Sequence, residues 1–178
     1  AISYFSDMSF HSFPGIDLGF DFSSNFKIYS NIGKTYRIPT YTDLYYSDRT
    51  TLGNENLNPE SAISSEFGIK YINSNLKFSA SLFNRDAKNI IDYAKENEND
   101  LWKAVNIGSL KTKGIEFDFL YNFMSKHTLS NTNSFTIGYT NIKDDNYVSN
   151  INFSRYSLNS LKHHLTTSVN LNYSKNIN

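Results

Sequence analysis

The chain alternates apolar and polar residues over seven separate segments, each long enough for one strand. Because successive side chains of a strand point to opposite faces, this period of two predicts sheet with one apolar and one polar face. Such alternation also occurs in soluble sheets that pack one face, so by itself it does not require a membrane. The segments cover residues 16–22, 26–37, 66–71, 76–83, 114–123, 134–140 and 164–173, and residues 105–113 before the fifth are less apolar.

The connections between these segments alternate strictly between short and long. Residues 23–25, 72–74 and 124–126 are tight turns, whereas residues 37–60, 87–101 and 141–162 are long and polar. Outer-membrane barrels have this asymmetry, with short periplasmic turns and long extracellular loops, and soluble domains seldom carry three such loops. We therefore predict an all-β, antiparallel transmembrane β-barrel whose first strand runs toward the periplasm. Aromatic residues beside the short turns are expected to form an interfacial girdle.

Seven segments do not make a complete bacterial barrel of this kind, because single chains form an even number of strands starting at eight. The chain is therefore expected to be partial, about seven strands of a larger barrel. A closing aromatic residue is also missing from the last five positions, Ser-Lys-Asn-Ile-Asn.

The composition is unusual for a protein whose whole surface contacts water. Aromatic residues make up 16% of the chain and charged residues only 19%. Seventeen basic and seventeen acidic residues balance, so no field of one sign would attract nucleic acid. The chain has no cysteine, which excludes disulfides and thiolate metal sites. No apolar run approaches the roughly 18 residues of a spanning helix.

Two segments and several later positions carry a family resemblance. The segment Gly-Lys-Thr-Tyr-Arg-Ile-Pro-Thr over residues 33–40 is followed by Gly-Asn-Glu-Asn-Leu-Asn-Pro-Glu over residues 53–60. Together with later positions they resemble the barrel signature of TonB-dependent receptors, and they are most similar to cobalamin and siderophore receptors. Glu55 stands where the family usually has proline. The signature positions are Gly33, Arg37, Pro39, Thr40, Gly53, Asn54, Leu57, Pro59, Glu60, Asn106, Gly114 and Glu116.

The resemblance implies uptake of a scarce, large ligand through a barrel of about 22 strands filled by a plug domain. Residues 1–178 would then form part of the barrel, with no plug domain in this chain. The implied partners are outer-membrane lipid, the plug of the same full-length chain, TonB through regions absent here, and a large small-molecule ligand such as cobalamin or a siderophore. Neither a cofactor nor a nucleic acid is implied, and the location is the bacterial outer membrane.

Within the long connections, Pro39 and Pro59 are expected to fix the backbone around the first loop, and Gly53 to supply a turn with positive φ. Aromatic and charged loop residues suit a large, partly apolar ligand. Ordinary loop surface or packing against the plug is the competing interpretation for each of them. The candidate ligand contacts are Arg37, Tyr41, Tyr45, Tyr46, Asp48, Arg49 and Trp102.

Other chemistry finds little support in the sequence. His163 and His164 are adjacent, so on a strand their rings point to opposite faces and cannot readily share a metal. No arrangement of nucleophile, base and acid stands out, and we predict neither an enzyme nor a metal site. Two alternatives remain at this point. One is a passive porin-like or adhesive barrel, and the other is a soluble carbohydrate-binding β-sandwich, which would press two apolar sheet faces together.

Overall fold

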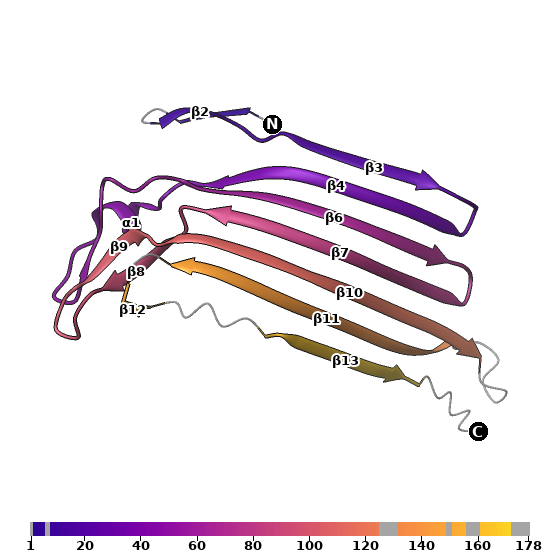
Figure 1. The fold of residues 1–178 in the computed structure, drawn as a ribbon. Coiled ribbons are helices and arrows are strands. Elements are labelled where there is room, and N and C mark those ends of the chain that lie inside the picture. The colour runs from indigo at the N-terminus through magenta and orange to yellow at the C-terminus, as the bar shows by residue number, and fades with distance from the viewer. Residues whose placement is uncertain (1, 6–7, 125–131, 149–150, 156–160, 172–178) are drawn as a thin grey trace, which may run out of the picture.

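The computed structural model describes residues 2–5, 8–124, 132–148, 151–155 and 161–171. Its main feature is one curved antiparallel sheet whose strands neighbour one another in chain order, without a crossover (Figure 1). This sheet confirms the seven predicted segments, the last as far as Asn170, while residues 172 and 173 lie outside the described residues. Its strands are β3 (Gly15–Asp21), β4 (Phe26–Arg37), β6 (Glu60–Ile72), β7 (Leu76–Lys88), β10 (Gly108–Met124), β11 (Thr132–Val148) and β13 (His163–Asn170).

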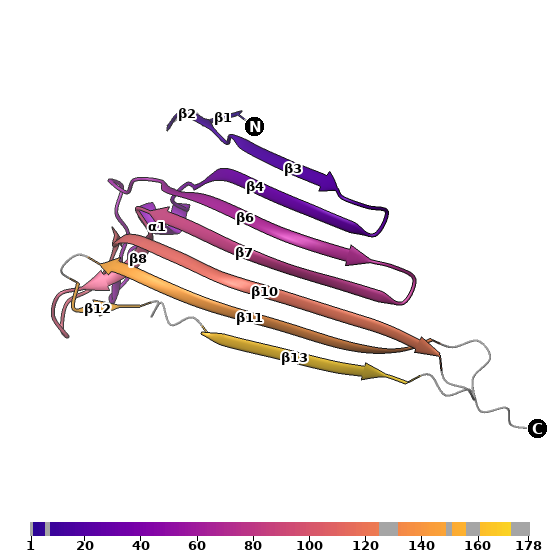
Figure 2. The same cartoon turned by 45° about the vertical axis from the view of Figure 1, so that its right-hand side comes forward.

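A smaller assembly lies at the end of this sheet away from the short β3–β4 and β6–β7 turns, as both views show (Figures 1 and 2). It contains a four-stranded sheet in the order β12-β8-β9-β5 and a short helix. We call residues 38–59, 89–107 and 151–155 the cap. Its elements are α1 (Tyr41–Tyr45), β5 (Thr51–Leu52), β8 (Ile91–Lys95), β9 (Trp102–Asn106) and β12 (Phe153–Ser154).

A separate two-stranded sheet, β1 (Ile2–Phe5) with β2 (Met8–Ser12), precedes the main sheet. No helix among the described residues is long and apolar enough to cross a membrane.

One face of the seven-stranded sheet is apolar and uncovered. Leu18, Phe67, Leu82 and Leu165 come from four different strands, and each exposes between 51% and 66% of its surface. The cluster of buried apolar residues found in the described part of the chain lies in the cap instead. A soluble sandwich would bury these rows against a second sheet, so the sandwich interpretation is wrong. The arrangement is that of a membrane barrel wall, with lipid in place of the second sheet.

The opposite face is polar and carries hydrogen bonds between strands. The Glu66 carboxylate on β6 accepts from the Tyr29 hydroxyl at 2.8 Å and from the Asn31 amide at 3.0 Å, both on β4. This face matches the polar side predicted from the alternation.

The strands are longer than the alternation predicts. β7 runs to Lys88 rather than residue 83, and β11 runs to Val148 rather than residue 140. Their outer parts keep a regular register, in which Thr112 pairs with Asp144. Beyond the apolar band both faces are polar, so period two disappears from the sequence while main-chain pairing continues. The connections expected at 87–101 and 141–162 therefore begin later, after Lys88 and Val148. The first of them also ends later, at residue 107, and the other ends as expected before His163.

The short turns are built from local hydrogen bonds and flanked by aromatic rings. Asn73 accepts from the backbone N–H groups of Asn75 at 2.9 Å and Leu76 at 2.7 Å, an Asx-type turn. Phe22 and Phe26 meet edge-to-face across the first turn, with ring centroids 6.2 Å apart. The third predicted turn, residues 124–126, lies outside the described residues after its first position. Aromatic pairs at this end support the predicted girdle.

The prediction of positive φ at Gly53 is wrong. Among the described residues, the positive values belong to Asn89 (55°) and Gly108 (126°). Gly53 is needed for a different reason, because a Cβ there would lie 2.8 Å from the carbonyl carbon of Leu44. The loop passes too close to the helix backbone for any side chain.

Candidate functional site in the cap

Main-chain pairing joins three separate connections of the large sheet into the cap. β5, from the β4–β6 connection, pairs in parallel with β9, from the β7–β10 connection, through Thr51↔Trp102 and Leu52↔Lys103. β12, from the β11–β13 connection, pairs antiparallel with β8. The predicted long loops therefore do not stand apart from one another but form one small sheet.

A compact apolar cluster holds this small sheet to the rest of the cap. Leu57, Ile91, Tyr93 and Ala104 are at most 7% exposed. Leu44 and Trp102 pack against them. The cluster draws on the first and second connections, so burying it stabilises their association rather than either loop alone.

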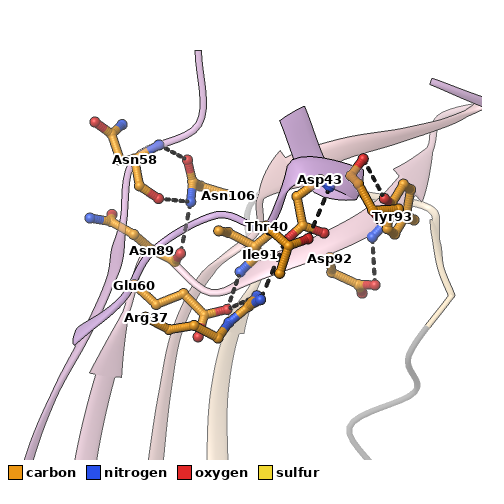
Figure 3. A network of polar contacts seen from close by, with 11 residues as sticks. Arg37, Thr40, Asp43, Asn58, Glu60, Asn89, Ile91, Asp92, Tyr93 and Asn106 are labelled. Carbon is orange, nitrogen blue, oxygen red and sulfur yellow. Dashed lines mark hydrogen bonds and ion pairs between the residues drawn. The ribbon is translucent and has the colours of Figure 1, made fainter. Parts of the chain in front are cut away.

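Arg37, at the end of β4, connects the barrel wall to the cap (Figure 3). Its Nη2 lies 2.7 Å from Glu60 Oε1 at the start of β6, and its Nη1 lies 3.3 Å from Asp43 Oδ2 on α1. The same Glu60 oxygen accepts from the backbone N–H of Ile91 on β8 at 2.8 Å. One guanidinium and two carboxylates thus join two wall strands, the helix and a cap strand.

Helix α1 has only five residues, too short to be stable alone. Thr40 and Asp43 form a reciprocal capping box: Asp43 N–H donates to Thr40 Oγ1 at 3.1 Å, and Thr40 N–H donates to Asp43 Oδ2 at 2.9 Å. Asp43 is 8% exposed and also meets Arg37, as described above. The Tyr93 hydroxyl donates to the Thr42 carbonyl at 3.3 Å, which fixes the helix to β8.

The signature asparagines clamp the two connections together. Asn58 N–H donates to Asn106 Oδ1 at 2.9 Å, and Asn106 Nδ2 returns a bond to the Asn58 carbonyl at 2.9 Å (Figure 3). Asn106 Nδ2 also reaches the Asn89 carbonyl at 2.7 Å, and Asn54 Nδ2 donates to the Ala104 carbonyl at 3.0 Å. These side chains satisfy main-chain groups of irregular segments. Asn54 and Asn106 therefore each hold backbone groups of the two connections in place.

The remaining signature residues lie in the wall and around the cap. A Cβ at Gly114 would lie 2.3 Å from the Asn141 carbonyl oxygen and 2.5 Å from the Phe83 ring. Pro39 is buried, while Gly33 and Pro59 are partly buried. Glu116 is exposed on the polar face of β10.

The structure separates the seven candidate ligand contacts into two groups. Tyr41, Tyr45 and Tyr46 are 79%, 51% and 46% exposed, and the first two rings lie 5.0 Å apart on α1. Arg49 is exposed beside them in the chain. Arg37, Asp48 and Trp102 have defined partners within the cap, described above and below. Tyr46 also has one, because its hydroxyl donates to Asp48, but its ring remains exposed. The exposed tyrosines and Arg49 form the available surface.

Asp48 organises the turn that carries Arg49. Its Oδ1 accepts from the backbone N–H groups of Thr50 at 2.7 Å and Thr51 at 2.6 Å, and its Oδ2 accepts from the Tyr46 hydroxyl at 2.9 Å. The Thr50 N–H and the Tyr46 hydroxyl lower the pKa of Asp48 from 3.8 to about 2, because both stabilise its charged form. The same hydrogen bond raises the pKa of Tyr46.

Two cationic side chains, Lys95 and Arg155, lie over aromatic rings of the small sheet. The sequence analysis did not predict a role for either of them. Lys95 Nζ lies 5.0 Å from the ring centre of Trp102, and Arg155 lies 6.0 Å from it and 5.8 Å from the Tyr93 ring. Asp92, 2% exposed, accepts from Ser154 on β12. Arg155 reaches the Tyr93 and Trp102 rings because β12 pairs with β8. No local sequence pattern predicts that pairing.

Comparison with known proteins identifies the family. Residues 3–177 match the model described as TonB dependent receptor-like, beta-barrel. The chain belongs to this family, as part of the receptor β-barrel. The long-loop end of such a barrel is extracellular, so the cap lies outside the outer membrane. The family consists of receptors rather than enzymes, which agrees with the prediction from the sequence.

Sequence relatives include vitamin B12 transporters. The chain is 30% identical over 111 residues to the vitamin B12 transporter BtuB of Vibrio vulnificus, covering 62% of this chain and 18% of that protein. It is 32% identical over 102 residues to BtuB of Vibrio cholerae, covering 57% and 16%. The chain therefore spans less than a fifth of the length of these relatives.

Solved structures share the fold at lower identity. The siderophore receptor PirA from Pseudomonas aeruginosa matches with a TM-score of 0.64 and 20% identity, over 78% of this chain and 26% of that one. The FrpB iron transporter from Neisseria meningitidis matches with a TM-score of 0.59 and 17% identity, over 76% and 20%. These similarities concern the fold alone.

Proposed function

We propose that this chain supplies part of the barrel wall and the extracellular cap of a receptor that takes up a large small-molecule ligand with energy delivered by TonB. Residues 1–178 contribute no plug domain in this proposal, and the plug of the same full-length chain completes the receptor. TonB would act through that plug rather than on these residues. The match of residues 3–177 to the receptor barrel family carries the proposal.

The cap supports a role in ligand binding because it is preorganised. Three connections are joined by strand pairing, an apolar cluster and the Arg37 ion pairs, so the exposed side chains above them need little ordering when a ligand arrives. We propose that Tyr41, Tyr45, Tyr46 and Arg49 contact the ligand. Arg37, Asp48 and Trp102 would hold the surface in place from beneath.

For the ligand class we propose a scarce, metal-bearing molecule of the size of cobalamin or a ferric siderophore. The sequence relatives are named vitamin B12 transporters, and the structural relatives are named as a siderophore receptor and an iron transporter. Cobalamin is the first ligand to test, because those sequence relatives are 30% and 32% identical to this chain.

The test uses the full-length receptor in its native membrane. Uptake of labelled cyanocobalamin and of ferric siderophores is measured in cells with and without the receptor, each with and without TonB. We expect one ligand class to accumulate only when both proteins are present. Accumulation that persists without TonB would contradict energy-coupled uptake and favour the passive-channel alternative.

A binding measurement on purified full-length receptor tests the surface. Simultaneous Tyr41→Ser and Tyr45→Ser substitutions remove exposed rings without touching the apolar cluster, so ligand affinity should fall while the cap stays folded. Leu101→Ser, another exposed apolar cap residue, serves as the matched control. Unchanged affinity in the tyrosine variant would exclude these rings as contacts.

A further inference from the structure

The apolar face of β10 and β11 ends abruptly near the cap. Along β10, exposed Phe117 and Ile115 are followed on the same face by Lys113. The paired positions on β11 are Tyr139, Asn141 and Lys143 in the same order. Since same-face residues are two apart, the lysines lie about 7 Å beyond the Ile115 level along the strand. A change from apolar to charged residues on the lipid-facing side is expected where a bilayer changes from hydrocarbon to headgroups.

An interfacial pair marks the same boundary. The Tyr139 hydroxyl and His163 Nδ1 lie 2.9 Å apart, and the Asn141 amide lies 3.2 Å from the same ring nitrogen. Amphipathic rings with a polar tip are enriched where a membrane meets water. The row of residues next above them therefore faces the headgroup region of the outer leaflet.

That row contains two like charges directly opposite one another. Lys113 pairs with Lys143 in the β10–β11 register, and both are exposed. Directly opposed side chains on one face have Cβ atoms roughly 5 Å apart, and like charges in this position destabilise a sheet. On its other side Lys113 faces the uncharged Asn84 of β7. An anion between the two ammonium groups would relieve the repulsion.

The next row outward differs although it also carries a lysine. Lys111 lies between Asp86 of β7 and Asp145 of β11, its direct partners in the register. Two carboxylates therefore share its row as register partners, although among the described residues neither forms an ion pair with it. Asp86 and Asp145 are also diagonal to Lys113, at about 7 to 8 Å, where each acts more weakly than a direct partner would. Uncompensated positive charge is therefore concentrated at Lys113 and Lys143, next to the apolar band.

We propose that Lys113 and Lys143 together bind a phosphate group of an anionic lipid in the outer leaflet. Their apolar stems extend along the strand surface while the ammonium groups reach the headgroup level. Each lysine near an anionic membrane surface contributes on the order of 1 kcal/mol. The site lies on the outward face, so it is distinct from the cap and does not rest on the proposed uptake function.

The experiment measures lipid affinity of the detergent-solubilised full-length receptor, with bisphosphorylated lipid A as the probe. Lys113→Gln combined with Lys143→Gln should weaken binding by about 30-fold, the ratio expected from two such charges. Dephosphorylated lipid A should bind the variant and the wild type equally. Lys113→Arg with Lys143→Arg should keep most of the affinity, because the positive charge remains.

Lys111→Gln is the matched control, since it removes one lysine from the same strand and face. We expect it to leave lipid affinity nearly unchanged. Heat-induced unfolding of each variant in detergent verifies that the barrel is intact. Equal affinity of wild type and double glutamine variant would overturn the proposal. So would an equal loss in Lys111→Gln, which would indicate general surface charge, or full competition by millimolar inorganic phosphate, which would indicate a free-anion site.

Discussion

At the scale of single residues, Arg37 shows how a signature position acts. Sequence reasoning named it both as a signature residue and as a ligand contact, and the structure gives its guanidinium two carboxylate partners. Side chains of Asp43 and Glu60 are only 11% and 21% exposed, so each would be poorly solvated without the arginine. Its partners come from α1 and β6, which no local pattern around residue 37 could have revealed.

Replacing Arg37 should loosen the cap without unfolding the wall. Arg37→Met leaves two partly buried carboxylates unpaired, at a cost of about 2 kcal/mol. The Ile91 amide donates a hydrogen bond to Glu60. Faster hydrogen exchange at this amide would report the change. Arg49→Met, the loss of an exposed arginine from the same connection, should leave that amide protected. Unchanged exchange in Arg37→Met would show that the ion pairs do not hold the cap.

Asp48 gives the cap a local dependence on pH. Its pKa is about 2 when folded and 3.8 ordinarily, so its contribution is complete above pH 4 and is lost as pH falls toward 2. Exchange of the Thr50 and Thr51 amides, measured from pH 5 to pH 2, should accelerate in the acid range relative to cap amides elsewhere. Asp48→Asn should exchange faster throughout and lose this extra dependence. A wild-type profile parallel to that of the variant would contradict the assignment.

At the scale of elements, the sequence predicts the membrane-spanning parts of the strands accurately. It predicts the parts outside the membrane poorly. Residues 114–123 alternate because lipid lies on one side and polar surroundings on the other, and β10 continues outward to Gly108 without that contrast. The cap strands were missed for a related reason. β5 and β12 have two residues each, far too few to show a period. Their partners lie about 50 residues away for β5 and about 60 for β12, beyond any local signal.

The pairing of β5 with β9 predicts that two loops behave as one unit. Residues 1–178 contain no cysteine, so within this part of the receptor Leu52→Cys with Lys103→Cys introduces one possible disulfide, between direct register partners. We expect it to form under mild oxidation and to leave ligand affinity of the full-length receptor unchanged, because the loops are already joined. Loss of affinity that reduction restores would instead show that the two loops separate during binding.

At the scale of the whole molecule, the two faces of the large sheet face different surroundings. Phe117 and Asp118 are neighbours in β10 but lie on opposite faces, toward lipid and toward the barrel interior. Sequence alternation predicted this division into two faces. It could not give the cap, which depends on contacts among three connections.

Charge should therefore be tolerated on one face and not on the other. Phe117→Arg places a cation in the hydrocarbon and should lower the free energy of unfolding in lipid vesicles by about 2 to 4 kcal/mol. Asp118→Arg, one residue away, should change it much less. Urea titration of the full-length receptor in vesicles measures both. Similar losses for the two variants would show that Phe117 does not face lipid.

The strand pairing that joins the cap places few demands on the side chains at its surface. Strand pairing between the three connections uses main-chain groups, which every amino acid except proline supplies in full. Exposed positions such as Tyr41 and Leu101 can therefore be replaced while the platform keeps its shape. Arg37 and Asn106 are more restricted, because their side chains have specific partners inside the cap.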